Sequence, residues 1–382
     1  MSEKTRYASV GEISYERSER IDSPSTSEIK RFVGLEHFDQ GNLDIVRFGS
    51  CVDLGSTMKK CVAGDTLIAR RNVYLNRASR CNFDALCSGD AIVLRENECV
   101  VPGFLSILFN SDSFWKFASS NADGTMSKRL SVSHLKSYEF CLPSVENQKK
   151  FVDLIWKLEN LKTKLVMELE NLNLLIKSQF IKMFGDLSIN DKSWKSDKLS
   201  NVLVIERGGS PRPIDDYITN EETGLNWIKI GDANDNSIYI DSVKEKIKPE
   251  GLKKTRRVYP DDLILSNSMS FGKPYILKIS GCIHDGWLVL HDENDIFDKI
   301  FLCYALGNSS TTKKFKSMAR GAVVNNLNKK IVGSLEIILP PRNLQNQFAD
   351  FVKQVDKSKL DSEFDLINLY QNHYFCNAGV LI

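Results

Sequence analysis

Basic side chains gather in three short runs of this 382-residue chain, although its overall charge is only +2. Residues 59–80 contain six Lys or Arg against one Asp, residues 244–257 contain seven against two Glu, and residues 313–330 contain six and no acid. Lys and Arg neutralise backbone phosphates, and their side chains also pair with guanine in the major groove. The three runs therefore favour nucleic-acid binding over the alternative that each is simply a solvated face.

Candidate DNA contacts lie in both halves of the chain. In the first half they are Arg70, Arg71, Arg77, Arg80, Lys128 and Arg129. In the second half they are Arg212, Lys253, Lys254, Arg256, Arg257, Lys273, Lys313, Lys314 and Arg320. We expect most of them to contact phosphates, because phosphate contacts outnumber base contacts in protein–DNA interfaces.

Motifs that would make the chain an enzyme by itself do not occur in the sequence. Adenine methyl transfer needs Asn or Asp followed by two prolines and an aromatic residue, whereas residues 339–342 read Leu-Pro-Pro-Arg. A phosphate-binding loop that ends in Gly-Lys-Ser/Thr is missing, and the five histidines lack metal-ligand spacing. We therefore expect no catalytic residue, metal site or cofactor in this chain.

Composition is that of an ordinary globular protein, with 42% hydrophobic and 26% charged residues. The nine cysteines are odd in number and form no Cys-x-x-Cys pair, which argues against a disulfide framework and a zinc site. No apolar run approaches the roughly 18–20 residues of a membrane span, and the first 20 residues lack a signal-peptide core. These features predict a cytoplasmic protein with reduced thiols and no membrane partner.

A long amphipathic helix is predicted in the middle of the chain, because residues 144–184 contain neither Gly nor Pro. Apolar residues recur there at steps of three and four, the spacing of one helix face. About 40 residues at 1.5 Å each span roughly 60 Å, a length at which helices usually pair. The positions predicted to form the core of a coiled coil are Phe151, Ile155, Leu158, Leu165, Leu169, Leu172 and Ile176.

A second helix is predicted near residues 343–375, with its spacing interrupted between Val355 and Leu360. It is expected to be shorter and weaker than the first. Its predicted core positions are Phe348, Val352, Val355, Phe364 and Ile367.

The chain also repeats itself. Residues 142–148 (Leu-Pro-Ser-Val-Glu-Asn-Gln) match residues 339–345 (Leu-Pro-Pro-Arg-Asn-Leu-Gln), an offset of 197, the distance from Leu142 to Leu339. At the same offset, residues 64–68 fall on 261–265, and Gly124 and Leu130 fall on Gly321 and Leu327. With one residue of slip, residues 91–94 fall on 287–290. The order of these matches indicates two copies of one unit, each a globule followed by a helix.

The predicted architecture follows from this repeat. Residues 1–143 and 187–340 are expected to form two mixed α/β globules, 144–186 a central helical spacer, and 341–382 a short distal helical region. The fold class is α+β, with two pseudo-symmetric globules separated by an antiparallel coiled coil of the two helices.

In four stretches the sequence resembles the DNA-specificity (S) subunits of type I restriction–modification systems. These are residues 142–148 leading into the helix that closes at 176–186; residues 124–130 with 321–328; residues 64–68 with 261–265; and residues 210–232 with 33–37. Together they extend over nearly the whole chain, and the resemblance departs from the family pattern only at the short second helical region.

The resemblance implies a defined biological role. Each globule would be a target-recognition domain that reads one half of a split, asymmetric DNA sequence, and the helices would set the spacer between the halves. The helices would also dock two methyltransferase subunits, and restriction/translocase subunits would complete the complex. S-adenosylmethionine, ATP and Mg²⁺ would bind those partner subunits and not this chain.

Two other functions remain open at this point. A stand-alone DNA-modifying enzyme would transfer methyl groups or cut DNA by itself, and a duplicated scaffold would show no salt-dependent DNA binding.

Overall fold

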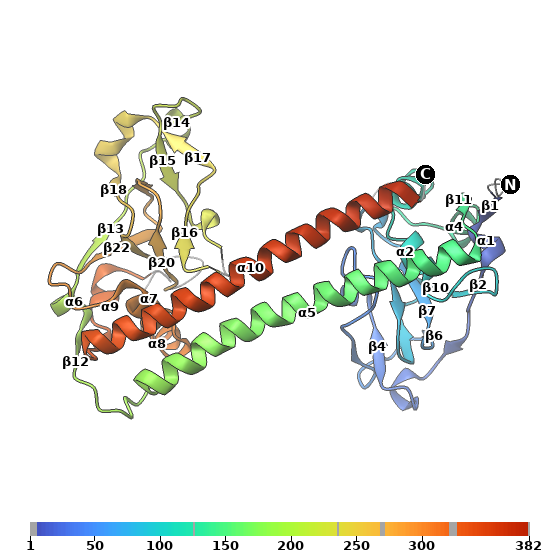
Figure 1. Cartoon of the computed structure of the whole chain (residues 1–382), viewed down its shortest axis with the longest axis horizontal. Coiled ribbons are helices and arrows are strands. Elements are labelled where there is room, and N and C mark those ends of the chain that lie inside the picture. Colours follow the sequence, from blue (N-terminus) through green and yellow to red (C-terminus); the bar gives the residue numbers. More distant parts are fainter. Residues whose placement is uncertain (1–5, 125–126, 235–236, 268–271, 321–326, 381–382) are drawn as a thin grey trace. The chain divides into compact units, whose positions relative to one another are not determined.

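The computed structural model describes residues 6–124, 127–234, 237–267, 272–320 and 327–380, apart from the side chains of residues 320, 363 and 366–380 (Figure 1). The chain forms two compact units: residues 1–168 with 362–382, and residues 169–361. Each long helix is shared between the two units. The boundary therefore falls inside the helices and not at their ends.

The strands of the first unit form three sheets, with the orders β1-β11, β2-β10-β7-β8 and β3-β6-β9-β4-β5. They are β1 (Arg6–Ser9), β2 (Ser14–Glu16), β3 (Arg20–Ile21), β4 (Arg31–Val33), β5 (Gly49–Ser50), β6 (Met58–Cys61), β7 (Asp65–Ala69), β8 (Ala78–Cys81), β9 (Ala85–Cys87), β10 (Ala91–Glu96) and β11 (Glu139–Leu142). Its short helices are α1 (Val10–Ile13), α2 (Phe104–Leu108), α3 (Asp112–Ser120) and α4 (Val132–Lys136), with 3-10 turns η1 (Pro24–Thr26), η2 (Leu35–His37) and η3 (Val73–Leu75).

The second unit repeats this plan, with the sheets β12-β23, β13-β22-β19-β20-β16 and β14-β17-β15-β21-β18. Its strands are β12 (Ser196–Lys198), β13 (Val204–Arg207), β14 (Ile218–Thr219), β15 (Leu225–Ile228), β16 (Tyr239–Ile240), β17 (Glu245–Ile247), β18 (Arg256–Val258), β19 (Leu263–Ser266), β20 (Pro274–Leu277), β21 (Gly281–Ile283), β22 (Trp287–His291) and β23 (Glu336–Ile338). Its short helices are α6 (Leu199–Val202), α7 (Lys299–Gly307), α8 (Ser309–Arg320) and α9 (Lys329–Gly333), with 3-10 turns η4 (Ile214–Asp216), η5 (Ile230–Asp232) and η6 (Pro249–Lys254).

The predicted duplication is confirmed by the pairing of the central strands. β7 pairs antiparallel with β10 and β8, as β19 does with β22 and β20. One parallel pair also recurs, β4 with β9 in the first unit and β15 with β21 in the second. The fold is the mixed α/β one expected from the sequence.

Two glutamines 197 residues apart make the same hydrogen bonds where each globule joins its long helix. Gln148 and Gln345 are both 1% exposed. Their side-chain amides donate to Pro143 O at 2.9 Å and Pro340 O at 2.8 Å. Their side-chain oxygens accept from Val101 N at 3.1 Å and Asp298 N at 2.8 Å. A buried amide is stable only when it is hydrogen-bonded, so the matching motifs mark a shared joint.

The central helix α5 (Val145–Phe184) runs unbroken for 40 residues. It ends where Gly185 adopts a φ of +82°, the left-handed conformation common just after a helix. At its start, Phe151, Val152 and Ile155 enter the core of the first unit. The middle of the predicted stripe, Leu158, Leu165, Leu169 and Leu172, is half-buried.

At its other end, α5 pairs with the distal helix α10 (Arg342–Val380) inside the second unit. The rings of Phe180 and Phe184 lie 5.3 and 5.6 Å from that of Phe348. Phe348 and Val352 are fully buried, and Val355 is 7% exposed. The last turns of α5 thus meet the first turns of α10, as an antiparallel pair requires.

Two predictions for the distal helix are wrong. α10 is not short: it spans 39 residues, because the slip in apolar spacing introduces no Gly or Pro and so does not interrupt the helix. Phe364 is not a core residue, since it is 65% exposed. The slip turns Leu360, also 65% exposed, and Phe364 away from the buried face. The side chain of Ile367 lies outside the described residues.

None of the helices in the described part of the chain is both long and apolar enough to span a membrane.

The aromatic cluster predicts a large difference between two phenylalanines of α10. Phe348→Ala should lower the free energy of unfolding of the second unit by about 3–5 kcal/mol, because it leaves a cavity among buried rings. Phe364→Ala is the matched control and should change it by less than about 0.5 kcal/mol. Urea denaturation followed by tryptophan fluorescence measures both, and equal effects of the two substitutions would contradict the packing described.

Candidate nucleic-acid interface

In the first unit, Asp90 gathers two of the predicted arginines. The carboxylate, in the turn before β10, lies 3.8 Å from Arg71 and 3.7 Å from Arg129. Its backbone carbonyl accepts from Arg70 N at 3.0 Å. Arg71 and Arg129 are exposed, whereas Arg70 is half-buried. Exposed ion pairs of this kind are weak, so the guanidinium groups are available to a phosphate.

Lys128 belongs to the same surface, because its segment lies against the loop between β7 and β8. Asn72 N donates to Lys128 O at 2.9 Å. Arg71 Nε donates to Ser127 Oγ at 3.0 Å. The structure thus brings together Arg70, Arg71, Lys128 and Arg129, although nearly 60 residues of sequence separate the two pairs.

Arg77 and Arg80 make contacts within the globule instead. Arg77 donates to Leu35 O at 2.9 Å, and burial lowers the pKa of its guanidinium. Arg80 donates to Asp44 at 3.1 Å, and its guanidinium lies 4.0 Å from the centre of the Trp156 ring on α5. The Arg80 contact with Trp156 joins β8 to α5, and the Arg77 hydrogen bond lies within the globule.

In the second unit, Asp285 occupies the corresponding turn, before β22. It accepts a 2.7 Å hydrogen bond from Ser210 Oγ, which holds the pKa of its carboxyl below the usual value despite partial burial. The carboxylate lies 3.6 Å from Arg212, whose side chain is 74% exposed. An exposed arginine is therefore held beside an acid in each unit.

The neighbouring His284 has a structural place. Gly286 N donates to its Nδ1 at 2.7 Å. Burial lowers the pKa of the imidazole, so it is neutral at pH 7. Its position beside a buried strand indicates that His284 supports the fold.

Three of the remaining basic residues near β18 contact aromatic rings or an acid. Lys254 lies 5.3 Å from the ring of Tyr217, and Arg257 lies 5.9 Å from that of Tyr259. Arg256 donates to Glu206 at 2.8 Å. Lys253 is exposed, and Lys273, directly before β20, is half-buried.

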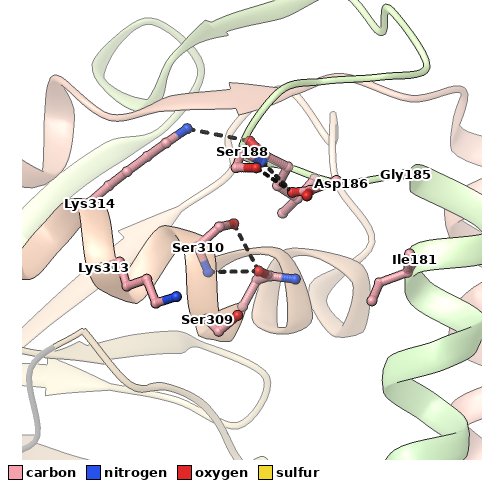
Figure 2. A pocket seen from close by; sticks show the side chains of 10 residues that line it. Ile181, Gly185, Asp186, Ser188, Ser309, Ser310, Lys313 and Lys314 are labelled. Atoms are coloured by element: carbon pink, nitrogen blue, oxygen red, sulfur yellow. Dashed lines mark hydrogen bonds between the residues drawn. The ribbon is translucent and has the colours of Figure 1, made fainter.

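Lys313 and Lys314 line a pocket of about 450 Å³ between the end of α5 and the start of α8 (Figure 2). Lys314 donates to Leu187 O at 3.3 Å. Ser188 donates to the Asp186 carboxylate at 2.7 Å, which lowers the pKa of that exposed group. The pocket therefore holds both charge signs. The side chain of Arg320, also predicted to contact DNA, lies outside the described residues.

Asp90, Ser210 and Asp285 are not among the site residues predicted from the sequence. The available signal was the repeat, since each acid lies in the turn before a strand that aligns with the other: Asp90 directly precedes β10, and one residue, Gly286, separates Asp285 from β22. Among the described residues, no three His, Cys, Asp or Glu side chains are grouped so as to hold a metal ion.

Comparison with known proteins connects this arrangement to one family. Residues 191–369 match the family model described as "Type I restriction modification DNA specificity domain". The "Putative type I restriction enzyme MjaX specificity subunit" of Methanocaldococcus jannaschii is 23% identical over 351 residues, which cover 84% of this chain and 79% of the relative.

Two solved structures share the fold over almost their full lengths. The Type-I restriction-modification system S subunit from M. genitalium superposes with a TM-score of 0.61 at 13% identity, covering 99% of this chain and 96% of that chain. A chain from a structure titled for complex assembly and conformational transition of the type I R-M system gives 0.60 at 19% identity, covering 98% and 97%.

Replacing an exposed arginine and replacing an arginine that makes contacts within the globule should have different effects. Arg71→Ala should weaken DNA binding for all sequences and lower the slope of log affinity against log salt concentration by about 0.9, the effect of one lost phosphate contact. Arg80→Ala should instead lower the free energy of unfolding by about 1–3 kcal/mol, since it removes a charged hydrogen bond and a cation–π contact. Fluorescence anisotropy and thermal melts measure the two; an Arg80→Ala protein of unchanged stability would refute the structural role.

Proposed function

We propose that this chain, whose residues 191–369 match the model of the type I restriction modification DNA specificity domain, is the subunit that recognises a bipartite DNA sequence for such a system. The observation that carries the proposal is the duplication. Two copies of one fold present basic residues beside the same turn, around Asp90 in one unit and Asp285 in the other. Two-domain readers bind half-sites whose separation follows from protein geometry.

The two long helices would set that separation. α5 contributes residues to both units, and α10 does as well. A continuous helix has a fixed rise of about 1.5 Å per residue, so its length fixes how many base pairs the two recognition domains leave unread.

Methyltransferase and restriction/translocase subunits would be the protein partners, with two methyltransferases in the complex. The helices offer them a surface, because several apolar side chains of α5 are exposed. Met167, Leu174 and Ile181 are 56%, 57% and 54% exposed and lie seven residues apart, hence on one face of the helix. Exposed apolar stripes of this kind commonly mark protein interfaces.

The chain itself would carry no catalytic step. Its contribution would be to place the DNA, while S-adenosylmethionine, ATP and Mg²⁺ bind the partner subunits. It would act in the cytoplasm, which is consistent with the free thiols of the eight described cysteines.

Methylome sequencing of cells with and without this gene tests the proposal. One split, asymmetric motif with methylated adenines should disappear when the gene is deleted and return when it is restored. Purified chain alone should transfer no methyl groups to DNA. An unchanged methylome in cells that express the whole system, or methyl transfer by the isolated chain, would count against the proposal.

The spacer role has its own test. One heptad inserted into both long helices keeps the apolar face and adds about 10.5 Å, or about three base pairs at 3.4 Å each. The methylated motif should keep both halves and gain about three unspecified base pairs. A seven-residue Gly/Ser insertion after Gly55, an exposed loop position, is the matched control and should leave the motif unchanged. A spacer of unchanged length after the helix insertion would contradict the role of the helices.

A further inference from the structure

The loop between β7 and β8, residues 70–77, has a conformation that few residues can adopt. Asn72 and Asn76 have φ values of +55° and +47° and flank the 3-10 turn Val73–Leu75. Asn is one of the few non-glycine residues that tolerate this left-handed region. Leu75 N donates to Asn72 O at 2.9 Å and Asn76 N to Val73 O at 3.0 Å. The loop is thus a defined turn and not a loose connection.

Contacts on both sides hold this turn in place. Val73 is 1% exposed and packs in the core of the first unit. Ser127 Oγ donates to Asn72 Oδ1 at 3.1 Å, and Arg77 anchors the far side of the loop at Leu35 O. A loop that is fixed before a partner arrives loses little entropy on binding.

This turn leaves two large side chains in solvent. Tyr74 is 67% exposed and Leu75 is 37% exposed. A rigid loop that exposes an aromatic ring gains nothing for folding from that exposure, and loops of this kind commonly carry binding function.

The charges around the ring indicate what it meets. Arg71 lies in the same loop, and Lys128 and Arg129 lie in the segment braced against it. The acid beside them, Asp90, faces two arginines. The surface is therefore net positive, which suits a nucleic-acid backbone.

The second copy carries an aromatic residue at the corresponding position of the sequence. Leu327 N donates to Asn267 O at 2.9 Å, as Leu130 N does to Arg70 O at 2.9 Å, so positions 267 and 70 are equivalent. Counting onward from them, Phe271 falls at the position of Tyr74. Phe271 lies outside the described residues, so the correspondence rests on sequence alone.

We propose that Tyr74 contacts bases directly in the half-site read by the first unit. The ring packs beside a base step and partly unstacks it, while Arg71, Lys128 and Arg129 hold the flanking phosphates. Side chains that enter a duplex in this way add contact area and kink the DNA locally. The inference rests on the proposed DNA-recognition function and adds a specificity residue to it.

The test compares Tyr74→Ala with Tyr74→Phe and with Tyr7→Ala, the last being an equally exposed tyrosine on β1 of the same unit. Each full-length chain, assembled with its methyltransferase, is titrated onto the motif found by methylome sequencing. Tyr74→Ala should lose about ten- to hundredfold in affinity for that motif but keep its affinity for random duplex and its salt dependence. The Phe and Tyr7 variants should bind as the unsubstituted protein does.

A second readout follows the bases themselves. 2-Aminopurine placed in turn along each half-site should brighten at one step of one half-site with the unsubstituted protein and with Tyr74→Phe, and stay quenched with Tyr74→Ala.

Equal motif affinity of Tyr74→Ala and the unsubstituted protein would overturn the role of Tyr74 and leave the proposed function standing. Unchanged DNA affinity with lost methyltransferase binding would overturn it too, by assigning Tyr74 to a protein contact. An unsubstituted protein that does not prefer the motif would instead overturn the proposed function.

Discussion

Aromatic packing at the end of α5 is the contact on which the second unit depends most. Phe180 and Phe184 meet Phe348 of α10, and the Phe184 ring also lies 4.7 Å from that of Phe301 in α7. One buried cluster therefore joins both long helices to the globule. A helix can define a distance only if its end is held, because a loosely attached helix has no fixed position or direction relative to the globule. The size of these four phenylalanine rings, which carry no polar group, makes this attachment rigid.

The buried glutamines also fix the attachment of the long helices, by hydrogen bonds instead of ring packing. Gln148 and Gln345 close the junction between the last strand and the helix in each copy with nearly identical hydrogen bonds. Because each glutamine is buried, its bonds are costly to break and fix the direction in which the helix leaves the globule. Duplication of the joint along with the sheets fits the proposed function, in which two copies of one fold in a single chain read two half-sites.

Much of this organisation could be predicted from sequence because it rests on local periodicity and on repetition. The apolar stripe of α5, its end at Gly185 and the offset of 197 all belong to short stretches of chain. The partners of individual arginines could not be predicted in this way. Arg80 contacts Asp44 and Trp156, which are remote in sequence, so nothing near it distinguishes it from the exposed Arg71.

The extent of α10 was missed for a related reason, since a break in apolar spacing changes which face is buried without ending the helix. Tyr74 shows the limit most clearly: its exposure depends on two left-handed asparagines and on contacts with residues 127 and 128.

The central claim is that one chain reads two separated half-sites through two copies of one fold. Competition binding tests it most directly, with the full chain and its methyltransferase and duplexes in which either half-site, both, or only the spacer is scrambled. Scrambling either half-site should lower the affinity, each by a characteristic factor. Scrambling both should lower the affinity by about the product of the two factors. Scrambling the spacer should leave the affinity unchanged. Binding that depends on only one half-site, or on the spacer sequence, would contradict the account.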